Sequence, residues 1–141
     1  MLNEEVRTIM TTETIVVGPN DTIVNVAQLM VESRIQQIPV VEGKLFLGLI
    51  TAFDLWKNSR NSESPDDKLV KDVMTTRVIK ITPKDKLGTA AELFMDKRFK
   101  TLPVVNLRNE LKGVITAFDI IRFTLKKEYK QPILFGEIIN A

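Results

Sequence analysis

One seven-residue stretch occurs twice in this chain, and it constrains the fold more than any other feature. Gly48-Leu-Ile-Thr-Ala-Phe-Asp54 returns as Gly113-Val-Ile-Thr-Ala-Phe-Asp119 with a single conservative change. In both copies an apolar, strand-like run ends in Thr, and an acid follows three positions later. This pattern is typical of a strand that runs directly into the first turn of a helix. We expect the function of the chain to lie at these two corners.

The repeat extends over most of the chain. Val6-Arg-Thr-Ile-Met-Thr-Thr12 matches Val70-Lys-Asp-Val-Met-Thr-Thr76, and Pro39-Val-Val41 matches Pro103-Val-Val105, each at a separation of 64 positions. The second copy then has one extra residue before its glycine, so the separation becomes 65. Self-similarity on this scale indicates one supersecondary unit used twice. Because only two copies occur, we expect a closed, pseudo-symmetric pair and not a solenoid.

Both copies predict the same order of elements. A short β-branched run precedes a turn, and Asp21 or Asp85 then occupies the expected N-cap of an amphipathic helix. Two short strands follow, joined as a hairpin, and the last one leads into a second helix. Each unit is therefore predicted as strand, helix, strand, strand, helix, which makes the fold class α/β (α+β).

The boundary between the copies is expected in a polar connection rich in Ser, Asn and Pro, residues 58–67. The predicted domains are residues 1–64, a first unit with an N-terminal arm and linker, and residues 65–141, a second unit with a C-terminal tail. The tail, residues 131–141, has no equivalent in the first copy. We expect it to cover the core or to make an oligomer contact.

Composition argues against several classes of function. The net charge of +2 is too small to favour nucleic acid, and no apolar run approaches the roughly 18 residues of a membrane span. With no Cys and no His, the commonest metal ligands and the commonest general base are missing. We therefore expect no catalysis, no metal site and no membrane insertion. The absence of a signal-peptide pattern predicts a cytoplasmic protein.

Taken together, these motifs resemble the cystathionine-β-synthase-type (CBS) domain family, arranged as a tandem pair or Bateman module. Each copy has Val-x-x-x-Met-Thr, then Ile/Leu-Pro-Val-Val before a hairpin, then Gly-x-x-Thr-x-x-Asp before the last helix. The resemblance covers roughly residues 5–127. It implies two β-α-β-β-α units packed sheet to sheet with pseudo-two-fold symmetry, and two clefts between them. Family members commonly bind adenosine-bearing ligands (AMP, ADP, ATP or S-adenosylmethionine) and usually regulate an attached enzyme, channel or transporter, whereas we expect this chain to act without an attached effector domain.

The resemblance assigns roles to the corner residues. Asp54 and Asp119 would accept hydrogen bonds from ribose hydroxyls, and Thr51 and Thr116 would donate to a phosphate. A carboxylate can accept from two vicinal hydroxyls, and a helix N-terminus favours an anion. The alternative is that Thr-x-x-Asp is only a capping box, which needs no ligand.

The segments before the two prolines supply further candidates. By the same resemblance, Ile35 and Phe99 would cover an adenine face, and backbone groups near Ile38 and Leu102 would read its edge. Lys100 would meet phosphates, and Thr12 and Thr76 match family ligand contacts. The alternative places Ile35 and Phe99 in the core and leaves the charges solvated. Whether one cleft takes its base contacts and its acid from the same unit stays open.

The function expected from all this is a stand-alone regulatory module that senses an adenine nucleotide and acts on a separate protein partner. The alternative is a structural or adaptor dimerisation module that binds no ligand. We expect a homodimer built on the helices after the corners, with contacts from Leu55, Trp56, Ile120, Ile121 and Phe123. The clefts should be unequal, since Lys97, Arg98 and Lys100 stand where the first copy has Ser33, Arg34 and Gln36.

Overall fold

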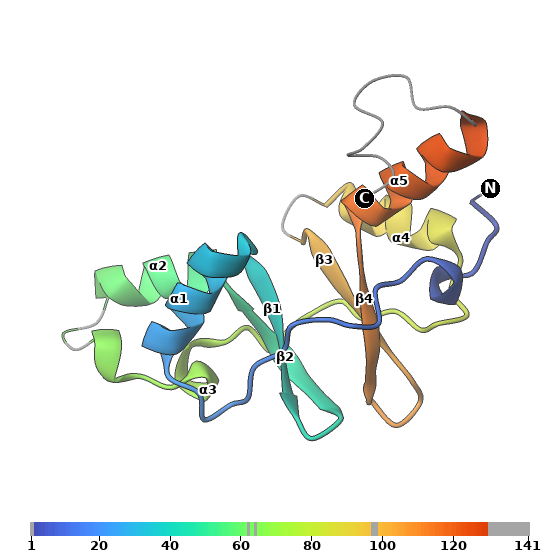
Figure 1. The fold of residues 1–141 in the computed structure, drawn as a ribbon. Helices are drawn as coiled ribbons and strands as arrows, with labels where there is room; N and C mark the ends of the chain where they lie inside the picture. Colours follow the sequence, from blue (N-terminus) through green and yellow to red (C-terminus); the bar gives the residue numbers. More distant parts are fainter. Residues whose placement is uncertain (1, 62, 64, 97–98, 130–141) are drawn as a thin grey trace.

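The computed structural model describes residues 2–61, 63, 65–96 and 99–129, and the described chain folds into two similar units (Figure 1). The first contains α1 (Ile23–Ser33), β1 (Gln37–Glu42), β2 (Leu45–Thr51) and α2 (Ala52–Asn61). The second contains α4 (Leu87–Phe94), β3 (Thr101–Val105), β4 (Leu111–Thr116) and α5 (Ala117–Glu128). Short helical turns lie in the segment before each unit: η1 (Val6–Thr8), η2 (Pro65–Asp67) and α3 (Val70–Val73). The tail, Lys97 and Arg98 lie outside the described residues.

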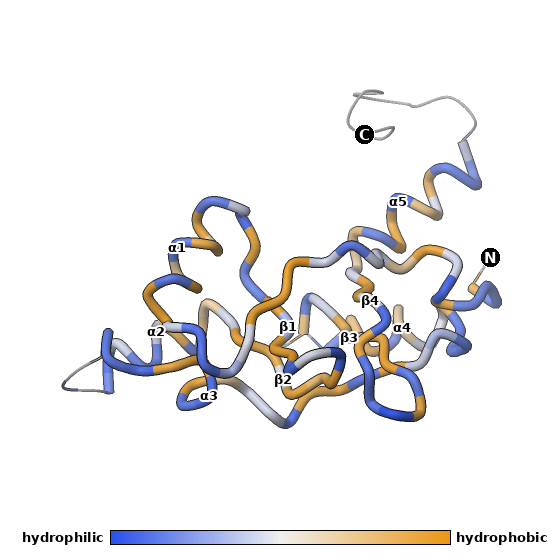
Figure 2. The backbone as a smooth tube through the Cα atoms, turned by 60° about the horizontal axis from the view of Figure 1, so that its bottom comes forward, coloured by the Kyte–Doolittle hydropathy of each residue, from blue (hydrophilic) through white to orange (hydrophobic). Residues whose placement is uncertain are grey.

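Two antiparallel hairpins meet at the centre of the molecule, and the helices lie on its outer sides (Figure 1). The hairpin ends are joined by backbone bonds from Phe46 N to Asn109 O (2.9 Å) and from Leu111 N to Lys44 O (2.8 Å). Phe46, Leu49 and Val105 form a buried cluster shared by the two hairpins. This arrangement confirms the predicted sheet-to-sheet pair. Figure 2 shows hydrophobic residues along the strands and also in the helices.

The first predicted strand of each unit is reduced to a single parallel bridge, Val17–Val40 or Ile81–Val104. Val17 N donates to Pro39 O (3.1 Å), and Val41 N donates to Val17 O (2.9 Å). The next bonds of a parallel ladder would need N–H groups from Pro19 and Pro39, and proline has none. Pro83 and Pro103 limit the second unit in the same way. The prolines thus stop each strand at one residue.

The predicted helix caps were wrong by one residue. Thr22, and not Asp21, is the N-cap of α1, and its side chain accepts from Asn25 N at 3.2 Å. The Asp21 carboxylate instead accepts from Gly18 N (2.7 Å) and closes the turn before the helix. Asp85 does the same for Thr82 N (2.7 Å), because an acid three positions after an amide readily bonds back to it.

The segments that precede the units are exchanged between them. Val6 is fully buried in the core of the second unit, among residues such as Leu87 and Leu102, whereas Val70 is fully buried in the core of the first. Backbone bonds follow the same pattern, from Val6 N to Asp85 O (2.7 Å) and from Val70 N to Asp21 O (2.9 Å). Figure 1 shows the N-terminal segment running beside α4, and α3 lying near α1. Each arm therefore completes the opposite unit.

Each arm then pairs with the last strand of the unit it completes. Thr75 and Leu49 exchange backbone bonds of 2.8 and 2.9 Å, and Thr11 and Val114 exchange bonds of 2.8 and 2.9 Å. The repeated glycines make this approach possible. A Cβ on Gly113 would lie 2.6 Å from Thr11 O, and a Cβ on Gly48 would collide with Thr75 O. The glycine of the repeated motif is thus required by the arm and not by a turn.

Candidate ligand-binding cleft

Both predicted corners form, and both are capping boxes. At the first, Thr51 N donates to Asp54 Oδ2 (3.0 Å), and Asp54 N donates to Thr51 Oγ1 (3.0 Å). At the second, Thr116 and Asp119 exchange equivalent bonds of 2.9 and 3.1 Å. The reciprocal bonds satisfy backbone donors that a helix start leaves without partners. The capping role is therefore present at both corners, and it leaves other atoms of these side chains available to a ligand.

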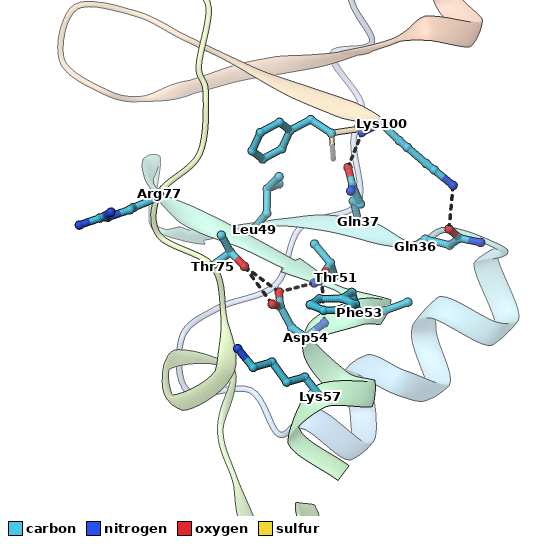
Figure 3. Close-up of a pocket in the computed structure, with 12 residues that line it drawn as sticks. Gln36, Gln37, Leu49, Thr51, Phe53, Asp54, Lys57, Thr75, Arg77 and Lys100 are labelled. Atoms are coloured by element: carbon cyan, nitrogen blue, oxygen red, sulfur yellow. Dashed lines mark hydrogen bonds between the residues drawn. The ribbon is translucent and has the colours of Figure 1, made fainter. Parts of the chain in front are cut away.

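Asp54 has an additional partner that Asp119 lacks. The hydroxyl of Thr75 donates to Asp54 Oδ1 (2.9 Å) and Oδ2 (3.1 Å), as Figure 3 shows. Among the described residues no such bond joins Thr11 to Asp119. A carboxylate has about four acceptor positions, so Asp54 keeps capacity for a further donor. Thr75, held by its backbone pairing with Leu49, fixes the orientation of the carboxylate.

A cavity of ≈ 690 Å³ opens at the Asp54 corner, a size within the ~300–1,000 Å³ of small-molecule sites. Its lining comes from β1, β2 and α2 of the first unit, from the exchanged arm, and from the segment before β3: Gln36, Gln37, Leu49, Thr51, Ala52, Phe53, Asp54, Lys57, Thr75, Arg77, Phe99 and Lys100. Its acid comes from one unit, and the apolar ring of Phe99 comes from the other.

The charges of this cleft favour an anion. Three cations, Lys57, Arg77 and Lys100, line it beside the single acid Asp54, and all three are solvent-exposed. They lie apart, with Lys57 and Arg77 on the Thr75 side and Lys100 near Gln36 (Figure 3). The first turn of α2 adds its N–H groups at Asp54, where an anion is favoured.

Gln37 joins the two units at the other end of the cleft. Its side-chain oxygen accepts from Lys100 N (3.1 Å) and from Thr101 N (3.0 Å), and Lys100 Nζ lies 3.5 Å from Gln36 Oε1. These bonds set the width of the cleft where β1 and β3 begin.

The structure brings four of the predicted site residues together in this cleft: Thr51, Asp54, Phe99 and Lys100. Ile38 and Leu102 are fully buried in the two cores, and Ile35 packs against the first core. Thr116 and Asp119 form the second corner. Thr12 lines a separate hollow of ≈ 190 Å³. Thr76 is exposed and does not line the Asp54 cleft.

Sequence reasoning missed Thr75, Lys57 and Arg77. The signal for Thr75 was present, because it is the last residue of the repeated Val-x-x-x-Met-Thr motif, one position before the predicted Thr76. Lys57 lies one turn after Asp54 on α2 and thus shares its face. No pattern in the sequence pointed to Arg77.

Within residues 2–61, 63, 65–96 and 99–129, no group of three His, Cys, Asp or Glu side chains could hold a metal ion.

Comparison with known proteins agrees with this architecture. The family model described as CBS domain matches residues 6–55 and again residues 70–126, so the chain belongs to the CBS-domain family and contains the domain twice. The "CBS domain-containing protein YhcV" of Bacillus subtilis is 30% identical over 115 residues, which span 82% of this chain and 81% of that protein. The inosine-5'-monophosphate dehydrogenase of Korarchaeum cryptofilum is 32% identical over 77% of this chain, which corresponds to only 22% of the enzyme.

A solved structure with the same fold contains a nucleotide. CBSX2 of Arabidopsis thaliana, crystallised in complex with AMP, superposes with a TM-score of 0.80 at 25% identity, over 89% of this chain and 98% of CBSX2. The similarity thus extends over the whole pair of units.

None of the helices in the described part of the chain is long and apolar enough to cross a membrane.

Proposed function

We propose that this chain is a regulatory module that binds an adenine nucleotide in the Asp54 cleft and transmits its occupancy to a separate protein in the cytoplasm. The observation that carries the proposal is the cleft itself, where one oriented carboxylate lies among three cations at a helix start. The AMP complex of CBSX2 supports the choice of ligand class.

Each group of the cleft has a role suited to such a ligand. Asp54 accepts from a ribose hydroxyl with the acceptor capacity that the capping box and Thr75 leave over. Among the described residues Thr51 Oγ1 accepts only from Asp54 N, so its own proton is available for a phosphate oxygen. Phe99 offers apolar surface to a purine, and Lys57 and Arg77 balance the phosphate charge.

A second candidate function is an adaptor that binds no nucleotide. It is favoured by the capping boxes, which satisfy both corners without a ligand. It is also favoured by exposed apolar side chains at matching positions of α2 and α5: Phe53 (65% exposed) and Trp56 (58%), Phe118 (55%) and Ile121 (55%). The two candidates differ in whether the cleft binds a nucleotide.

Melting temperatures in the presence of AMP, ADP, ATP, S-adenosylmethionine and NAD separate the candidates. A ligand that binds only the folded chain stabilises it by about 2.7 kcal/mol at ~100 times its Kd. For a domain of this size we expect a rise of roughly 10 °C with at least one phosphorylated adenosine compound. GMP and CMP serve as matched anions of the same charge. A melting temperature unaffected by every adenosine compound would favour the adaptor.

We further propose that two copies associate through α2 and α5. Of the expected contacts, Trp56 and Ile121 are exposed, Leu55 and Phe123 are half-buried against the cores, and Ile120 is buried. The exposed Phe53 and Phe118 add to this surface. Light scattering is expected to give a dimeric mass at micromolar concentration, and the double variant Trp56→Lys, Ile121→Lys a monomeric one. A monomeric wild type, or a double variant that stays dimeric, would contradict this interface.

A further inference from the structure

The two corners carry opposite charges at one equivalent position. Thr75 pairs with Leu49 beside Asp54, and Thr11 pairs with Val114 beside Asp119, in the same register. Two residues beyond the paired threonine, the first corner has Arg77 and the second has Glu13. Glu13 is the counterpart of Arg77 in the repeat, at the same separation of 64 positions as Thr11 and Thr75. The pseudo-two-fold axis therefore exchanges a cation for an acid.

Arg122 and Asp119 also differ in their contacts from their counterparts at the first corner. Arg122 is the counterpart of Lys57, but its guanidinium lies over the Phe118 ring, 4.8 Å from the ring centre. Asp119 receives no hydroxyl bond from Thr11, in contrast to the Thr75–Asp54 pair. By this equivalence Glu13 adds a second acid to the Asp119 corner, whereas the lining of the Asp54 cleft has one acid and three cations.

We propose that the Asp54 cleft is the site for a phosphorylated adenosine compound, and that Glu13 makes the Asp119 corner exclude phosphate. The second corner then suits an uncharged or cationic adenosine compound, such as a nucleoside or a sulfonium. This inference rests on the proposed function and adds the ligand class of each corner. A phosphate carries a charge of about −1.5 to −2 at neutral pH, so exchanging a nearby cation for an anion changes its binding strongly.

Calorimetric titrations of AMP and adenosine into four forms of the full chain test the proposal. The wild type is expected to bind one AMP per chain. Arg77→Glu should weaken AMP by roughly tenfold or more, which is one decade in Kd, and change adenosine by no more than about twofold. Glu13→Arg should add a second AMP per chain. Arg77→Lys, which keeps the charge, should stay within about threefold of the wild type for AMP.

Ionic strength supplies an independent readout. Exposed charges are screened beyond about 8 Å at physiological salt, so the difference between wild type and Arg77→Glu should shrink as salt is raised. Two AMP per wild-type chain would show that Arg122 holds a phosphate at the second corner and would overturn the inference alone. So would unchanged AMP affinity in Arg77→Glu, or a single AMP in a folded Glu13→Arg chain. Failure of the wild type to bind either compound would overturn the proposed function together with the inference.

Discussion

Replacing Gly48 with alanine is expected to destabilise the chain by about 3 kcal/mol, because the new methyl group would collide with the carbonyl of Thr75. Overpacking typically costs ~1–3 kcal/mol, and each lost backbone hydrogen bond adds about 0.5–1.5 kcal/mol. The two bonds between Leu49 and Thr75 are the ones at risk. Chemical denaturation measures the loss directly, and the melting temperature should fall by roughly 10 °C.

Gly18→Ala provides the matched control for this substitution. A Cβ on Gly18 would meet its nearest neighbours at 3.8 Å, an ordinary contact, so this variant should remain close to the wild type. Gly48→Ala should also weaken nucleotide binding, since a displaced Thr75 no longer orients Asp54. Equal stability of Gly48→Ala and wild type would mean that the arm does not pair with β2 as described.

Removing residues 1–11 is expected to destabilise the second unit, although these residues precede the first. The arm buries Val6 completely in the second core, and burial of a valine contributes about 1.5–3 kcal/mol. Its carbonyls also accept from the start of α4, Glu4 O from Leu87 N (2.8 Å) and Leu2 O from Gly88 N (2.9 Å). The combined loss, about 4 kcal/mol or more, is a large part of the stability of an ordinary domain.

Hydrogen exchange locates the effect of this truncation. Amides of α4 and β4 should lose protection first, while those of α1 and β2 keep theirs until global unfolding. Two point variants give the matched comparison, since Val6→Ala should act on the second unit and Val70→Ala on the first. Loss of protection confined to α1 and β2 after truncation would contradict the exchange of arms.

Short sequence patterns predicted the helices and hairpins of each unit well, because these elements are determined by residues close together in the sequence. The Thr-x-x-Asp spacing identified both helix starts, since the capping box joins residues three positions apart. The repeat identified the pair of units, and the resemblance identified their sheet-to-sheet packing. The first strand was overestimated because β-branched residues predict a strand, while Pro19 and Pro39 prevent its ladder from extending.

Contacts between the units were beyond local reasoning. Thr75 bonds to Asp54 across 21 positions, and no periodicity relates two such residues. Gly48 looked like part of a strand, and the reason for it is the backbone of a distant arm. Thr51, Asp54, Phe99 and Lys100 could be named from the sequence, whereas Thr75 and Arg77 became evident only from the position of the arm in the fold.

The central claim is that Asp54 holds the sugar of an adenine nucleotide, and the affinity for AMP of wild type and Asp54→Asn tests it most directly. Asparagine keeps one side-chain oxygen to cap α2 but removes the charge that strengthens bonds to ribose hydroxyls. Asp21→Asn, whose carboxylate closes a turn outside the cleft, is the control. We expect Asp54→Asn to bind AMP at least about tenfold more weakly while Asp21→Asn binds as the wild type does. Equal affinities in all three proteins would contradict the assignment.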